Sequence, residues 1–294
     1  MMATESSTYY VPEQSKLPLV TGIGLGVMAW GAATWAKGGS NMVFLAGVLI
    51  LGTALFSWFS TVIRENRAGL TNDQLKRSYV WAMTWFIFSE AMFFAVLFGS
   101  LFYVRMLALP WLSEGPTQEL LWNGFEASWP LFVTPDMAVA GEAARVKGPD
   151  AIIDPWHLPL INTLILMASS VTLHVAHTAL KKNNRKPFLV WLGITVVLGI
   201  AFLFFQVEEY IEAYRELGLT LGSGIYGTTF FMLTGFHGAH VTLGTFMLLV
   251  QWLRGLKGHF SHDDAFGFEA SSWYWHFVDV VWVGLFIFVY VLGS

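Results

Sequence analysis

Five ionisable side chains lie inside long apolar stretches of this sequence, where their burial must be offset by a partner. They are Glu90 in one stretch, His237 and His240 in a second, and His276 and Asp279 in a third. A spacing of three residues places both members of a pair on one face of a helix. An ionisable group inside a membrane is costly and marks a candidate functional site. These five residues are therefore candidates for a buried polar site that could support proton movement.

Each candidate also has a structural interpretation. Glu90 lies near mid-membrane and could relay protons, anchor a neighbouring subunit, or remain uncharged in a hydrogen bond to another helix. Two histidines three residues apart could supply two metal ligands, with a carboxylate completing the site. However, His237 and His240 lie near mid-depth, whereas a second pair, His174 and His177, lies near an inner end. We therefore expect interhelical hydrogen bonds and no metal site.

Further polar residues lie at the ends of apolar stretches. Glu208 and Glu209 close one stretch at its outer end, with Glu212 on nearly the same face, and we expect solvated or lipid-facing acids there. Trp58 and Arg254 lie at inner ends, where such residues anchor helices at the interface. The planar guanidinium of Arg254 could also bind a lipid phosphate.

The composition points to a membrane. Hydrophobic residues make up 55% of the 294 residues and charged residues only 12%, about half the ~25% usual in soluble domains. No basic patch suggests nucleic acid. The complete lack of cysteine excludes thiolate metal sites, iron–sulfur clusters, disulfides and covalently attached haem.

Seven apolar stretches are long enough to span a bilayer, which takes ~20 residues. We therefore expect an all-α integral membrane protein, with residues 1–294 forming a single membrane domain. The first stretch is too long for a signal-peptide core and predicts a retained helix. The expected helices cover about 17–36, 42–63, 79–104, 158–180, 187–210, 225–253 and 270–293.

Basic residues predict the orientation, because cytoplasmic segments carry an excess of lysine and arginine. With a cytoplasmic N-terminus, 11 of the 16 basic residues fall on the inner side. An odd number of spans then places the C-terminus outside. The expected topology is N-in and C-out.

One connection is much longer than the others. The outer segment 105–156 holds six of the ten prolines and seven acids against three bases. We expect an insertion lying over an outer surface. The alternative is a docking aid for a cationic partner such as cytochrome c.

Small residues predict where helices approach closely in lipid. Gly22 and Gly26 form a GxxxG pair in the first apolar stretch. Gly235 and Gly238 lie in the sixth apolar stretch, where the lack of a side chain leaves room for a neighbouring helix. We expect helix contacts at these four positions.

The C-terminal half closely resembles subunit III of the haem–copper cytochrome c oxidases. The resemblance covers roughly 42–104 and 156–293 but not the long outer segment. It rests on QVEEYIEA at 206–213, GIYGTTFF at 224–231, TGFHGAHV at 234–241, FGFEA at 266–270 and WYWHFVDVVW at 273–282. Upstream, Ser89-Glu90 followed by Phe93-Phe94, and PLINT at 159–163, also match.

This resemblance implies a V-shaped fold, with two helices set against five and phospholipid held in the cleft. Such subunits carry no haem or copper, bind subunits I and II, and meet cytochrome c only indirectly. They protect the oxidase during turnover and support proton uptake in respiratory O₂ reduction. The implied location is the bacterial inner (plasma) membrane, with the mitochondrial inner membrane as an alternative.

The resemblance also assigns individual residues. Glu90 matches a buried carbodiimide-reactive acid and is also a lipid-binding candidate, and Trp58 and Arg254 match positions associated with lipid headgroups. His237 and Glu209 match motif residues with structural or lipid-related roles, and no residue is implied to be catalytic. Two other classes stay open: a membrane di-iron oxygenase or desaturase using the histidines, and a proton or solute transporter, although no inverted repeat supports the latter.

Overall fold

The chain folds into helices connected by short links and one longer segment. The computed structural model describes residues 14–260 and 265–293 and contains no strand within those ranges. Seven helices in these ranges are long and apolar enough to cross a membrane, so the expected all-α class and the seven spans are confirmed. Glu13 and Ser294 lie outside the described residues.

The spanning helices begin and end close to the expected positions, with most ends longer by a few residues. Polar residues at these ends still continue the backbone hydrogen-bond ladder, which extends each helix into the interfacial region. The bounds are α1 Leu17–Ala36, α2 Met42–Arg67, α3 Asp73–Tyr103, α7 Leu158–Lys181, α8 Arg185–Arg215, α9 Gly224–Leu256 and α10 Phe266–Leu285, with α10 extended by a π-helical turn at Phe286–Val291.

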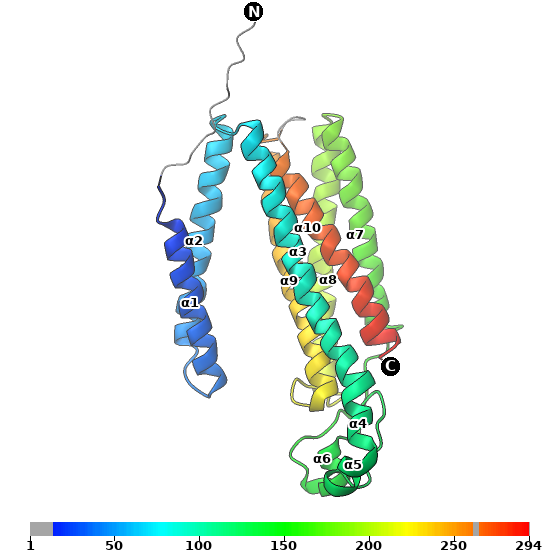
Figure 1. The fold of residues 1–294 in the computed structure, drawn as a ribbon. Coiled ribbons are helices and arrows are strands. Elements are labelled where there is room, and N and C mark those ends of the chain that lie inside the picture. Colours follow the sequence, from blue (N-terminus) through cyan, green and yellow to red (C-terminus); the bar gives the residue numbers. More distant parts are fainter. Residues whose placement is uncertain (1–13, 261–264, 294) are drawn as a thin grey trace, which may run out of the picture. The chain divides into compact units, whose positions relative to one another are not determined.

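Two compact units make up the chain, divided within α3 between Ala82 and Met83. In the first unit α1 packs along α2 (Figure 1). A Cβ on Gly31 would overlap the backbone of Phe44, and one on Gly47 would overlap the backbone of Met28. These glycines let the two backbones approach directly.

The expectation of helix contacts at four glycines of α1 and α9 was wrong at three of them. A Cβ added at Gly22, Gly26 or Gly238 would meet no other helix within 4 Å, and one added at Gly235 would meet only the Tyr210 hydroxyl, at 3.5 Å. A GxxxG spacing marks one helix face but does not say which face meets a neighbour. In this fold α1 turns a different glycine, Gly31, toward α2.

The second unit packs α7, α8, α9 and α10 around one hydrophobic core (Figure 1). Trp275 of α10 is fully buried against Gly199 of α8 and Gly244 of α9. A Cβ on either glycine would lie 2.8 Å from the indole ring. Helix α7 ends at Lys181, and Asn183, the residue after its C-cap, has a φ of +55°, the left-handed conformation that commonly follows a helix end.

The long outer segment begins later than expected. The helix that starts at Asp73 continues through a π-helical turn, Val104–Ala108, and α4, Leu109–Ser113. The expected loop from residue 105 is therefore helical up to Ser113. The remainder carries two short helices, α5 Gly115–Leu121 and α6 Pro135–Ala140, and a 3-10 turn, Gly141–Ala143.

This segment is held by its own polar contacts. The Asp136 carboxylate accepts the backbone N–H groups of Arg145 at 2.6 Å and Val146 at 3.0 Å. The Thr134 hydroxyl donates to the Val146 carbonyl at 2.7 Å. Phe125 and Leu131 are buried in the core of the unit. These contacts fold the segment onto one end of the second unit, and the prediction that this end lies outside the membrane stays a prediction.

Candidate functional site

Glu90 of α3 and His240 of α9 form a hydrogen-bonded pair. His240 Nε2 lies 2.9 Å from the Glu90 carboxylate, although the two residues are 150 positions apart. His240 Nδ1 lies 2.7 Å from the Phe236 carbonyl, which can only accept, so Nδ1 carries a proton. The pair then either joins a protonated carboxyl to neutral imidazole or joins carboxylate to imidazolium. Both forms have no net charge, which suits a site at membrane depth.

Aromatic rings fix the orientation of this imidazole. The His240 ring stacks on Phe93 at 6.1 Å and on Tyr274 at 6.3 Å, and it meets the edge of Phe94 at 4.9 Å. Side-chain exposure is 23% for Glu90 and 13% for His240, so the pair reaches the surface of its unit. It is therefore a polar spot on an otherwise apolar helix face.

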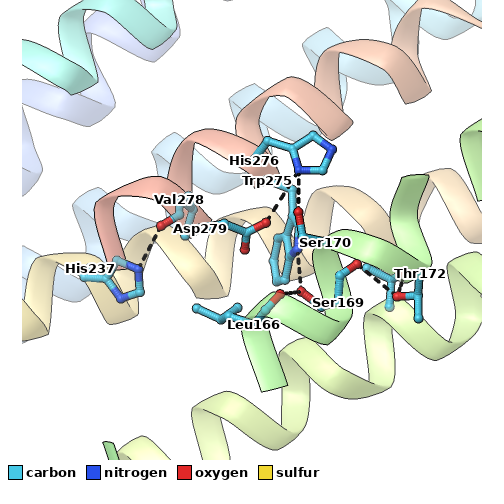
Figure 2. A network of polar contacts seen from close by, with 10 residues as sticks. Leu166, Ser169, Ser170, Thr172, His237, Trp275, His276, Val278 and Asp279 are labelled. Carbon is cyan, nitrogen blue, oxygen red and sulfur yellow. Dashed lines mark hydrogen bonds and ion pairs between the residues drawn. The ribbon is translucent and has the colours of Figure 1, made fainter. Parts of the chain in front are cut away.

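His276 and Asp279 of α10 form a second group with Ser170 of α7 (Figure 2). His276 Nδ1 lies 2.9 Å from the Ser170 hydroxyl and 3.6 Å from the Asp279 carboxylate. Asp279 is buried, whereas 40% of the His276 side chain is exposed. The i, i+3 spacing in the sequence does bring these two side chains together.

A chain of hydroxyl contacts continues from this group between helices, as Figure 2 shows. Trp275 Nε1 donates to the Ser169 hydroxyl at 2.9 Å, and that hydroxyl donates to the Leu166 carbonyl at 2.7 Å. One turn further, the Thr172 and Thr195 hydroxyls lie 2.8 Å apart and join α7 to α8. These contacts pin three helices together without a charged group.

His237 does not join its neighbour His240. Its side chain is fully buried, and its Nε2 lies 3.2 Å from the Val278 carbonyl of α10, to which it donates. Its ring packs against Phe202 and Trp282. The five candidate residues therefore form three separate groups: Glu90 with His240, His276 with Asp279, and His237 alone.

The histidines do not gather around a metal position. Within residues 14–260 and 265–293, no group of three or more histidine, aspartate or glutamate side chains is arranged to hold a metal ion. His177 instead lies 3.5 Å from Glu269, near the C-terminal end of α7.

The expected lipid contacts divide into surface and interior residues. Trp58 of α2 is 37% exposed. Arg254 of α9 donates to Gln251 at 2.9 Å and lies over the Phe260 ring at 4.7 Å. Arg254 lies in the last turn of α9, whereas Trp58 lies nine residues before the end of α2, inside the helix rather than at the end where it was expected.

Glu209 differs from expectation because it is fully buried, not solvated or lipid-facing. The Tyr290 hydroxyl donates to it at 2.6 Å. One residue along a helix turns the side chain by about 100°, so Glu209 faces the core although its neighbour Glu208 is exposed. Burial of Glu209 and of His237 favours the structural alternative for both residues over contact with a headgroup.

Sequence reasoning missed the uncharged partners of these groups. Ser170, Tyr274 and the threonine pair at 172 and 195 carry no signal beyond being hydroxyls in apolar helices. Hydroxyl side chains on facing helices commonly bond across a membrane interface. Their partners lie on other helices, so spacing along one helix could not identify them.

This arrangement defines a class: a membrane protein with seven candidate spanning helices among its described residues, several of which are joined by polar contacts between helices. Comparison with known proteins gives the family. Residues 7–294 match the family model described as cytochrome c oxidase subunit III. The chain belongs to this family.

Curated relatives agree over their full lengths. Proteins named "Cytochrome c oxidase subunit 3" from Dugong dugon, Drosophila melanogaster and Equus caballus are 38%, 38% and 36% identical, with 100% of each chain aligned. The oxygenase and transporter alternatives gain no support from these matches. The chain is a subunit of a cytochrome c oxidase, an oxidoreductase complex.

Proposed function

We propose that this chain is the non-catalytic accessory subunit of a proton-pumping oxidase, with haem and copper carried by partner subunits I and II. Family membership supports the complex, and the lack of any cysteine agrees with a chain outside the thiolate copper centre. In this role the chain stabilises subunit I, binds phospholipid and supports proton uptake during O₂ reduction.

The Glu90–His240 pair is the observation that carries this proposal. A polar pair that reaches the surface near mid-membrane would be unfavourable against lipid tails, because hydrocarbon offers no hydrogen-bond partner. The pair therefore fits a face covered by another membrane polypeptide. Within that interface it acts as a neutral polar anchor between this chain and subunit I.

The topology and the lipid sites belong to the same proposal. The excess of basic residues on one set of links supports N-in and C-out in an energy-coupling inner membrane, the bacterial plasma membrane in the first instance. The division of the chain within α3 supports a two-plus-five arrangement of helices. Arg254 and Trp58 supply the cation and the interfacial ring expected for a phospholipid headgroup.

The composition of the purified complex tests the accessory role. In mild detergent the chain should co-purify with larger polypeptides that carry haem and copper, and the isolated chain should show neither. A reduced-minus-oxidised spectrum and metal analysis give the result. Iron remaining in stoichiometric amount on the isolated chain would contradict the proposal and assign the histidines as ligands.

Substitution of the pair separates an anchor from a proton relay. In Glu90→Gln the amide can still donate to His240 Nε2, so we expect normal assembly and nearly unchanged pumping per electron. In His240→Leu the Glu90 carboxyl loses its partner at membrane depth, where a charge costs about 2.5–3.5 kcal/mol, and we expect loss of the subunit from the complex.

Both readouts are needed, namely subunit stoichiometry by gel and protons released per electron in vesicles. A large loss of pumping in Glu90→Gln with normal assembly would show that the Glu90 proton itself moves during turnover.

A further inference from the structure

Four polar side chains in the core of the α7–α10 bundle retain atoms with no protein hydrogen-bond partner. Both amide atoms of Asn162, one oxygen of Glu209 and Nδ1 of His237 are in this state, and the Gln206 amide, which lies close enough to interact with the Tyr290 hydroxyl, has no hydrogen bond of full geometry. Asn162, Glu209 and His237 are fully buried, and Gln206 is 5% exposed. They come from α7, α8 and α9, so no single helix accounts for them.

Helix register places Asn162 and Gln206 at one level. The Thr172 and Thr195 hydroxyls meet at 2.8 Å and fix how antiparallel α7 and α8 align. Asn162 lies ten residues before Thr172 on α7, a distance of ~15 Å along the helix axis. Gln206 lies eleven residues after Thr195 on α8, a distance of ~16.5 Å. Because the two helices are antiparallel, both distances run in the same direction. Both residues belong to the buried faces of their helices.

Trp282 of α10 connects this level to His237. Its Nε1 donates at 2.9 Å to the hydroxyl of Thr163, the residue after Asn162. Its ring lies 5.0 Å from the His237 ring and 4.7 Å from Phe202, which is one turn before Gln206. The same indole ring therefore contacts His237, the residue after Asn162, and the residue one turn before Gln206.

Hydrogen-bond chemistry selects what could satisfy these atoms. Leaving a buried amide without a partner is destabilising, and this layer holds two amides and an imidazole nitrogen. The group includes donors and acceptors, and water can serve both. Buried water in proteins typically makes about three such bonds. A cation would leave the amide N–H groups unsatisfied, and an anion would meet Glu209.

We propose that the bundle interior binds ordered water between Asn162, Gln206 and His237, and that this water extends the Glu209–Tyr290 pair into a hydrogen-bonded chain. The ligand is water itself, bound in the core of the subunit and separate from the Glu90–His240 pair. The chain begins at the outer end of α8, where Tyr290 donates to Glu209 at 2.6 Å.

A double-mutant cycle in the whole oxidase complex tests the bridge. Asn162→Leu and Gln206→Leu should each lower the temperature at which this chain dissociates. Each substitution removes one hydrogen-bond partner of the water and so weakens the bonding of the other amide as well. The double variant should lose much less than the sum, since both amide partners of the water are then gone and neither amide is left without it. Asn162→Leu combined with Thr172→Val, which removes a satisfied hydroxyl of the same helix, is the additive control.

A core without bound water predicts a change of the dissociation temperature in the opposite direction. If the core is dry, Asn162→Leu replaces an unsatisfied amide by an apolar group, and the dissociation temperature rises. Strict additivity of the two leucine substitutions would equally overturn the proposal.

Radiolytic labelling with ¹⁸O water provides a readout that does not depend on stability. Phe202 and Phe188 are both on α8 and both buried, but Phe188 packs on the Phe260 and Phe268 rings. Bound water should make Phe202 incorporate label and leave Phe188 unlabelled, and the double leucine variant should lose the label at Phe202. Equal labelling of the two phenylalanines in the parent complex would contradict a water site.

Discussion

Replacing Gly31 with leucine is expected to separate α1 from α2. A Cβ at this position overlaps the backbone of Phe44, so the helices must move apart and lose contact along their length. Overpacking costs about 1–3 kcal/mol when a side chain can adjust, and more is expected here because the obstacle is backbone. Because the helices meet in lipid, no hydrophobic driving force restores the contact.

Thiol cross-linking measures this separation cleanly, since the parent chain has no cysteine. In a background with Trp35→Cys and Phe44→Cys, positions whose rings lie 5.7 Å apart, a short bifunctional reagent should link the helices. Gly31→Leu should abolish the link. Gly26→Leu is the matched control, because a Cβ there would meet nothing within 4 Å, and the link should persist. Efficient cross-linking in Gly31→Leu would refute the close approach.

Replacing Trp282 with alanine is expected to destabilise the second unit by about 3–5 kcal/mol, the usual loss for a large buried aromatic. The ring is fully buried and contacts Phe202, His237 and Tyr290 on two other helices and its own. Its loss also removes the donor to Thr163. The measurement is the temperature at which this chain dissociates from the purified oxidase.

Trp282→Phe separates packing from hydrogen bonding. It keeps an aromatic ring against Phe202 but leaves the Thr163 hydroxyl without its donor, so a loss of only about 1–2 kcal/mol is expected. Val280→Ala is the surface control on the same helix, because Val280 is 70% exposed. If alanine and phenylalanine at position 282 were equally destabilising, packing of this ring would not be what joins the helices.

The helices and their number could be predicted because both depend on local composition. Each span needs an uninterrupted apolar stretch, and the backbone must bond to itself wherever it crosses lipid. The seven spans follow from that rule alone. The end of the third span was predicted less well: Arg105 and Pro110 suggested a loop, yet the helix continues to Ser113, with Pro110 lying just after the π-helical turn Val104–Ala108.

Pairing within one helix was partly predictable, and pairing between helices was not. The spacing of His276 and Asp279 brought them together, because both lie on one face of α10. The same spacing gave no contact between His237 and His240, because each bonds to a different helix. His237 donates to the Val278 carbonyl of α10, and His240 bonds to Glu90 of α3.

By itself the sequence determined the membrane class, the seven spans, the family through its motifs, and which polar residues had to be explained. The tertiary structure alone decided which glycines meet a neighbour, that Glu209 faces the core, and that Glu90 is paired with a histidine 150 residues away. The reason is physical: a helix forms from local hydrogen bonds, whereas the direction each face points is set by packing against helices distant in the chain.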